Sequence, residues 1–207
     1  MDLSKFTERS RGFIQAAQTI ATRESHQRLS PEHVLKALLD DDQGLARNLI
    51  AASGGDGARV MQALDLALGK IPKVTGDAGQ VYLDGTTAKV LAEAETMAKK
   101  AGDSFVTVER ILTALCMVKS GAKTALEAGK VTAQALNTAI NDVRKGRKAD
   151  SATAEDSLGS STYVPFQRFT QLQEQLAGID TIDGLAPGIG EFAPTINNRT
   201  SLSEGQM

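Results

Sequence analysis

The feature that most constrains the fold of this chain is an internal repeat. The segment from Ala16 to Leu39 aligns without a gap on the segment from Glu93 to Cys116, an offset of 77 residues. The two copies share identical or similar residues at many positions, among them Ala17 with Ala94, Thr19 with Thr96, Ala21 with Ala98, Leu29 with Val106, Glu32 with Glu109, Leu35 with Leu112 and Leu38 with Leu115. One supersecondary unit used twice explains this pattern, because a unit of this length buries too little surface to be stable alone.

The apolar residues within each copy have helical spacing. From Phe13 to Ala21 and from Val90 to Ala98 they recur three and four positions apart, which gives each helix one apolar face. Thr7 and Ser30 stand where helix N-caps are expected. Aromatic residues make up only 4% of the chain, and its apolar residues are mostly Ala and Leu, which favour helix over strand. We therefore predict an all-α fold of roughly eight helices, in which two pseudo-symmetric four-helix repeats pack into one globular domain.

The repeat also sets the expected domain boundaries. We place the domain at residues 1–148, with a first repeat at about 1–71, a connector at 72–85 and a second repeat at about 86–148. Beyond it we expect a linker at 149–164, a possible short amphipathic helix at 165–177 and a mostly disordered tail at 178–207, which is rich in Gly, Pro, Asn, Ser and Thr.

Charge and composition exclude several classes of partner. A net charge of −2 and a pI of about 5.8 give no reason to expect nucleic acid. The cationic cluster from Arg144 to Lys148 is interpreted as a solvated helix C-terminus, where basic residues followed by Gly are common. No apolar run approaches the roughly 20 residues of a membrane span, and the first residues lack the apolar core of a signal peptide. We expect a cytoplasmic protein with no membrane partner.

No catalytic or metal-binding pattern is visible. Cys116 aligns with Leu39, so we predict that it fills a core position and is not a nucleophile. His26 and His33 lack further ligands at a familiar metal-site spacing. The sequence has no phosphate-binding P-loop, and the GLAPGIGEF stretch near its end lacks the required Lys. We therefore expect no catalytic residues, no metal, no cofactor and no ATP hydrolysis in this chain.

Five strings carry a resemblance to a known family: FTERSRGFIQAAQTIA, LSPEHVLKALL, IPKVTGDAGQVYL, KKAGDSFVTVERILTAL and TAQALNTAINDVRKGRKADSATAED. They resemble the double Clp N-terminal domain, and the connector and the GDSFVTVE turn are similar to those of ClpB-type disaggregases in particular. The resemblance covers nearly all of residues 1–156. From about Leu158 we expect the likeness to end, before any ATPase domain, as after a frameshift or in a shortened reading frame.

The resemblance implies a function and a set of site residues. It implies that the full-length protein is a hexameric ATP-driven disaggregase, and that this domain contacts unfolded or aggregated polypeptide and passes it toward the central pore; the shortened chain is expected to be a monomer. Thr7, Asp103 and Glu109 fall on the family's substrate-contacting positions, beside a groove to which Leu91 and Met97 contribute. Arg110 stands where the family pattern has an apolar residue.

The two copies differ at one turn, and this adds a further candidate. Asp103 and Phe105 stand opposite His26 and Arg28, so an acid and an aromatic residue replace a cationic turn. Our hypothesis is a shallow apolar groove with an acidic rim formed by Asp103 and Glu109, which binds exposed apolar segments and favours nearby basic residues. The alternatives are an adaptor-docking domain of the ClpA or ClpC type and, for the shortened chain, an inert protein or one that competes with the intact chaperone for clients.

Overall fold

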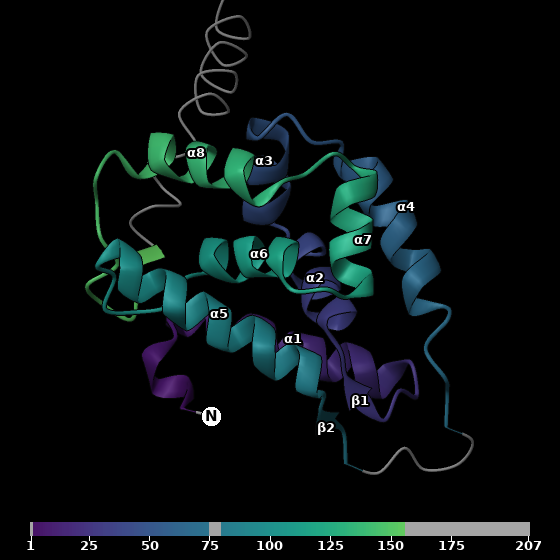
Figure 1. Cartoon of the computed structure of the whole chain (residues 1–207). Coiled ribbons are helices and arrows are strands. Elements are labelled where there is room, and N and C mark those ends of the chain that lie inside the picture. The colour runs from purple at the N-terminus through teal and green to yellow at the C-terminus, as the bar shows by residue number, and fades with distance from the viewer. Residues whose placement is uncertain (1, 75–79, 156–207) are drawn as a thin grey trace, which may run out of the picture. The chain divides into compact units, whose positions relative to one another are not determined.

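Two sets of four helices follow one another in the computed structural model, which describes residues 2–74 and 80–155 (Figure 1). The first set is α1 (Glu8–Arg23), α2 (Pro31–Leu39), α3 (Leu45–Ala52) and α4 (Gly57–Leu68). The second set is α5 (Gly85–Ala101), α6 (Val108–Met117), α7 (Gly121–Ala128) and α8 (Ala133–Arg144). A 3-10 turn, η1 (Leu3–Lys5), precedes α1. The predicted all-α fold of two four-helix repeats is confirmed.

Two short parallel pairings join the repeats. The two pairings involve equivalent positions of the two copies, which are 77 residues apart. Strand β1 (Arg28–Leu29) pairs with β2 (Tyr82–Leu83), which places Leu29 opposite Leu83. Phe6 forms a parallel bridge with Val106. Phe6 is equivalent to Leu83 in the alignment of the two copies, and Leu29 is equivalent to Val106. The segment before the first helix of each repeat therefore pairs with the segment before the second helix of the other repeat.

The helix starts beside these pairings follow the same symmetry. Thr7 donates its backbone N–H to the carbonyl of Val106 at 3.0 Å, and Asp84 donates its own to the carbonyl of Leu29 at 3.1 Å. Thr7 caps α1 by accepting from the N–H of Ser10, as predicted, and Asp84 caps α5 in the same way. Each side chain satisfies a backbone donor that a helix start leaves open.

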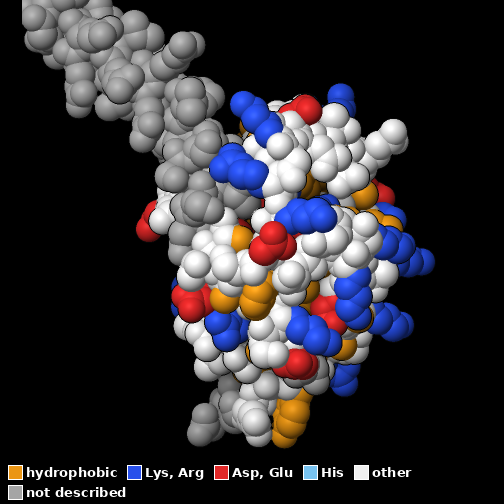
Figure 2. Space-filling view, turned by 90° about the vertical axis from the view of Figure 1, so that its left-hand side faces the viewer, with side chains coloured by type: hydrophobic (Ala, Val, Ile, Leu, Met, Phe, Trp, Pro, Cys, Tyr) orange, Lys and Arg blue, Asp and Glu red, His pale blue; other side chains and the backbone are white. Residues whose placement is uncertain are grey.

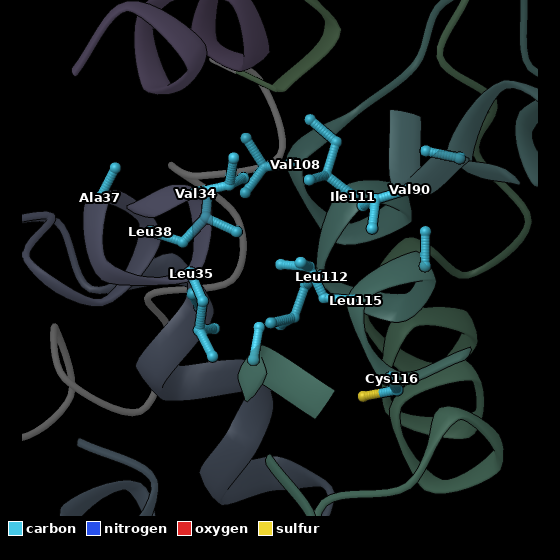
Figure 3. Packing of buried hydrophobic residues seen from close by; sticks show 14 of the residues in the cluster. Val34, Leu35, Ala37, Leu38, Val90, Val108, Ile111, Leu112, Leu115 and Cys116 are labelled. Carbon is cyan, nitrogen blue, oxygen red and sulfur yellow. The ribbon is translucent and has the colours of Figure 1, made fainter. Parts of the chain in front are cut away.

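The core of the domain is centred on the contact between α2 and α6 (Figure 3). Leu35 of α2 and Leu112 of α6 occupy equivalent positions in the two copies, and both side chains are completely buried. Burying one such side chain stabilises a fold by about 1.5–3 kcal/mol. Since equivalent helices meet at this contact, each repeat provides the other with the surface that it needs to become stable.

Cys116 belongs to this core. Its side chain is 8% exposed and lies in the hydrophobic cluster shown in Figure 3. Burial raises the pKa of the Cys116 thiol to about 12, which leaves very little reactive thiolate at neutral pH. The predicted core role of this residue is confirmed.

The chain does not leave the domain at residue 148. The segment from Ala149 to Glu155 continues onto the domain, and Figure 1 shows it running down beside the C-terminal end of α5. Ala149 is fully buried and Glu155 is 2% exposed. The remainder of the predicted linker, the possible helix at 165–177 and the tail at 178–207 lie outside the described residues. In the part of the chain that the structure describes, no helix is long and apolar enough to cross a membrane.

Candidate functional site

A buried arginine joins the two acids that the sequence singles out. Arg144, the last residue of α8, donates from Nη1 to both carboxylate oxygens of Asp103 at 2.7 Å and from Nε to Oε1 of Glu109 at 2.8 Å. Its Nη2 donates to the hydroxyl of Thr107 at 2.9 Å. Asp103, Glu109 and Arg144 are only 7%, 5% and 4% exposed. This cluster connects α8 to the bend between α5 and α6, here called the α5–α6 bend (residues 102–107).

A second arginine completes the charge balance. Arg110 donates from Nε to Oδ2 of Asp103 at 3.1 Å and is itself 5% exposed. Burial alone would raise the pKa of Asp103, but the backbone N–H of Ala149 and the Arg144 guanidinium hold this pKa below its usual value. Burial likewise opposes the charge of Arg144, and Glu109 and Asp103 outweigh it, so the pKa of Arg144 is raised. Two carboxylates and two guanidinium groups therefore share one buried site.

This geometry corrects two expectations. Asp103 and Glu109 do not form an exposed acidic rim, because both carboxylates face arginines inside the domain. Arg144 is not part of a solvated helix end either, although Lys145, Arg147 and Lys148, which follow it, are exposed. Charged side chains are buried at tolerable cost only when they are paired and hydrogen-bonded, and here each of the buried charges stabilises another.

The first repeat has an uncharged version of the same arrangement. His26 and His33 occupy the positions equivalent to Asp103 and Arg110, and their Nδ1 and Nε2 atoms lie 2.8 Å apart. Nδ1 of His33 accepts from the backbone N–H of Ser30 at 3.1 Å, which places the proton of neutral His33 on Nε2, facing His26. Burial and the neighbouring His26 lower the pKa of His33 to about 4. In residues 2–74 and 80–155, no group of three or more His, Cys, Asp or Glu side chains could hold a metal ion.

A third carboxyl group enters the site from the segment after α8. Glu155 accepts a hydrogen bond from the hydroxyl of Thr7 and another from the backbone N–H of Val108, in the first turn of α6. Thr7 is completely buried and Glu155 nearly so. Burial and the neighbouring Glu109 carboxylate raise the pKa of Glu155 to about 8. The surroundings of this side chain therefore favour its neutral, protonated form.

The backbone of the same segment covers the α5–α6 bend. Ala149 donates its N–H to Oδ1 of Asp103 at 3.0 Å. The carbonyl of Ala149 accepts from the N–H groups of Ser104 and Phe105 at 3.0 and 3.1 Å, and the carbonyl of Ala152 accepts from the N–H of Glu8 at 2.9 Å. The segment thus contacts the bend and the starts of both α1 and α6.

Comparison with known proteins places the chain in a family. The family model described as the Clp repeat N-terminal domain matches residues 5–129, more than half of the chain. This protein belongs to the Clp repeat family. The chaperone protein ClpB of Agrobacterium fabrum is 56% identical over 201 residues, which make up 97% of this chain and 23% of that protein. ClpB of Mesorhizobium japonicum is 58% identical over 159 residues, 76% of this chain and 18% of that protein.

A solved structure agrees on the fold. The crystal structure of the Hsp104 N-terminal domain from Candida albicans has a TM-score of 0.65 to this Clp repeat domain, at 21% identity, and the match covers 72% of this chain and 98% of that one. The ClpB relatives identify the chain as the N-terminal portion of a ClpB-type chaperone. The chain spans only about 23% of the length of the Agrobacterium relative.

The comparison with the ClpB relatives also shows that the expected end of the sequence likeness to ClpB, at about Leu158, was wrong. The match to the Agrobacterium ClpB covers 97% of this Clp repeat protein, whereas the match to the Mesorhizobium ClpB covers 76%. The likeness to ClpB therefore continues well beyond Leu158, where the sequence alone led us to expect that it stops.

The six residues predicted to form the site lie at different depths in the Clp repeat domain. Thr7, Asp103 and Glu109 converge, although they come from the start of α1, the α5–α6 bend and α6. Leu91 is 1% exposed and belongs to the core, while Met97 and Phe105 are partly buried. Figure 2 shows the side of the domain that contains the α5–α6 bend, which lies on the left in Figure 1. The hydrophobic side chains visible on this side form small separate groups among basic and acidic side chains.

The ion-pair roles of Arg110 and Arg144 were not recognised from the sequence, in which Arg110 was only a departure from the family pattern and Arg144 was part of a solvated cluster. Arg110 stands opposite His33 in the aligned copies, so a permanent cation replaces a weakly basic residue. This difference, taken together with the acid at Asp103, is a signal of an ion pair between these two residues. Glu155 gave no such signal, because it lies beyond the second repeat and was assigned to a linker.

Proposed function

We propose that this ClpB-type N-terminal domain binds exposed apolar segments of misfolded or aggregated polypeptides, at the surface formed by the α5–α6 bend and the starts of α1 and α6. The observation that carries this proposal is convergence. Thr7 is far from Asp103 and Glu109 in the sequence, yet the three residues that the resemblance implies for client contact lie close together: Glu155 accepts from Thr7 and from the N–H of Val108, next to Glu109, and Arg144 donates to Glu109 and Asp103. If these residues served only the stability of the domain, there would be no reason for them to be the same three that the resemblance assigns to client contact.

The chemistry of this surface favours main-chain and apolar contacts. The buried acids are neutralised by arginines, so they offer little attraction to basic side chains of a client. Phe105 and Met97 present part of their side chains, and the first turns of α1 and α6 contain the backbone N–H groups of Glu8 and Val108, which donate to residues after α8. A client segment with free carbonyl groups and small apolar side chains would fit these donors in place of the residues after α8.

Binding at such a surface is expected to be weak. Burying about 300 Å² of apolar surface at about 25 cal/mol per Å² gives about 7 kcal/mol, most of which is offset by the motion that both partners lose. The expected dissociation constant is therefore micromolar or weaker. In a hexamer of longer chains, several such domains would bind one aggregate together and still release it. Hexamer formation, ATP-driven disaggregation and a cytoplasmic location belong to this proposal for the whole protein.

Fluorescence polarisation tests the proposal. The 207-residue chain is titrated into labelled lactalbumin that is either native or reduced and carboxymethylated, which keeps it unfolded. We expect binding to the unfolded form alone, and weaker binding by the Phe105→Ser variant. The matched control is Leu66→Ser, since Leu66 of α4 is 65% exposed. No binding to the unfolded form, or the same loss for both variants, would reject the proposed surface. Selective binding of a folded adaptor protein would instead support the ClpA- or ClpC-type alternative.

A further inference from the structure

We propose that residues 149–155, here called the strap, are an intrachain occupant of the client site, so that a client binds by displacing them. This inference rests on the proposed function, because it takes the α5–α6 bend and the starts of α1 and α6 as the place where clients bind. It adds a regulated step that the family assignment does not contain.

The strap occupies the same groups that the proposed function assigns to clients. Its Glu155 carboxyl takes the hydroxyl of Thr7 and the N–H of Val108. The N–H of Ala149 takes an oxygen of Asp103, and the carbonyl of Ala149 takes the N–H of Phe105. No client could use these donors and acceptors while the strap holds them. Site residues that are buried in the structure would become accessible once the strap leaves.

The strap is suited to be displaced. Apart from Glu155, its residues are Ala149, Asp150, Ser151, Ala152, Thr153 and Ala154, so it has no large apolar side chain to anchor it in the core. Its docking depends on hydrogen bonds, each of which a client backbone or water could replace. Glu155 also faces the Glu109 carboxylate, and the Arg144 guanidinium beside Glu109 is already shared between Glu109 and Asp103. This surrounding favours release of the strap when Glu155 ionises.

The strap also indicates which client segments compete best. Its backbone carbonyls satisfy N–H groups of the α5–α6 bend and of α1, and one carboxyl satisfies the starts of α1 and α6. A client segment that replaces all of these contacts would combine small residues with an acidic side chain. A synthetic peptide with the sequence of residues 148–156, KADSATAED, is therefore a defined probe of the site.

The test compares two acidic residues of the strap in the full chain. Glu155→Ala removes the buried carboxyl, and Asp150→Ala, its matched control, removes an exposed one. If the strap is docked in about nine molecules of ten, its release raises the affinity for carboxymethylated lactalbumin about 10-fold. We expect this gain for Glu155→Ala and no change for Asp150→Ala. Glu155→Gln, which keeps the shape and hydrogen-bonding capacity of the neutral acid, should stay close to the unsubstituted chain.

A second measurement needs no variant, and so covers the case in which Glu155→Ala fails to fold. Amide hydrogen exchange in the unsubstituted chain is followed with and without saturating carboxymethylated lactalbumin. Displacement of the strap predicts faster exchange at Ala149, whose N–H donates to Asp103 when the strap is docked. The KADSATAED peptide, but not the same peptide with Ala in place of Glu, should compete with lactalbumin.

The outcomes separate the two proposals. Lactalbumin binding with equal affinity for Glu155→Ala and Asp150→Ala, and with unchanged exchange at Ala149, would overturn the strap as an occupant and leave the proposed function standing. Absence of lactalbumin binding in the unsubstituted chain and in a folded Glu155→Ala variant would overturn both. A gain in affinity restricted to Glu155→Ala supports both.

Discussion

The hydroxyl of Thr7 donates a hydrogen bond to the carboxyl group of Glu155, 148 residues further along the chain. This contact joins the first helix cap of the domain to the segment that follows its last helix. The same carboxyl also accepts from the first turn of α6, the helix at the centre of the core. A single side chain outside the two repeats therefore links the start of α1 in the first repeat to the start of α6 in the second.

The docking of Glu155 should depend on pH in a defined direction. The pKa of Glu155 is about 8 in the folded protein, against an ordinary value of 4.5, so the folded state holds the proton more tightly than the unfolded state. Its contribution to the free energy of unfolding is full below pH 4.5 and is lost as the pH rises through about 8. Urea unfolding of the chain and of Glu155→Gln, between about pH 5 and about pH 9, measures this. The unsubstituted chain should lose stability relative to the variant; a constant difference would contradict the assignment.

Arg144 should be far more important for stability than its basic neighbours. Arg144→Met leaves two buried carboxylates without their shared cation, and breaking a buried pair in this way costs about 3–5 kcal/mol. Arg147→Ala, in the exposed part of the same cationic cluster, should change the free energy of unfolding by less than about 0.5 kcal/mol. Urea unfolding compares the two variants, and equal, small effects would show that Arg144 is solvated after all.

The histidine pair of the first repeat should resist protonation. Because burial and His26 lower the pKa of His33 to about 4, its ring should titrate well below the ordinary value of 6.5. The lowered value also means that the folded protein loses stability as the pH falls from 6.5 through about 4, since the unfolded state then binds more protons. The pH dependence of the His33 ring-proton shift in NMR spectra is the measurement. A midpoint near 6.5 would mean that the pair is open to water.

The two repeats should unfold together. Leu35→Ala and Leu112→Ala each remove a buried side chain from the contact between α2 and α6, and each should cost about 2–5 kcal/mol. The exposed Leu66→Ala serves as the control and should change the free energy of unfolding by less than about 0.5 kcal/mol. Calorimetry should find one transition for both core variants. Separate melting of α1–α4 in the Leu35 variant would contradict a shared core.

The repeated architecture could be predicted because each copy carries the same local signals. Apolar spacing specifies which face of a helix is buried, and Leu35 and Leu112 keep that face in both copies. Cap residues such as Thr7 mark where helices begin. The pairings of β1 with β2 and of Phe6 with Val106 were not predicted, since strands of one or two residues have no periodicity to detect.

The charged interior of the site could not be predicted by the same means. A lone Arg at a helix end, such as Arg144, normally points into water, and the sequence around it does not show that Asp103 and Glu109 lie within reach. Their convergence depends on how α8 packs across the α5–α6 bend, which is a tertiary relationship. Glu155 likewise owes its buried position to contacts with Thr7 and Val108 that no local pattern encodes.

The most direct test of the account is where a client touches the domain. Backbone amide signals of the 207-residue chain are followed by NMR while carboxymethylated lactalbumin is added to saturation. The account predicts that the largest chemical-shift changes occur at Phe105, Val108 and the strap, with small changes at the exposed α4 residue Leu66. Saturating lactalbumin that shifts signals elsewhere, and leaves those of Phe105 and Val108 in place, would contradict it.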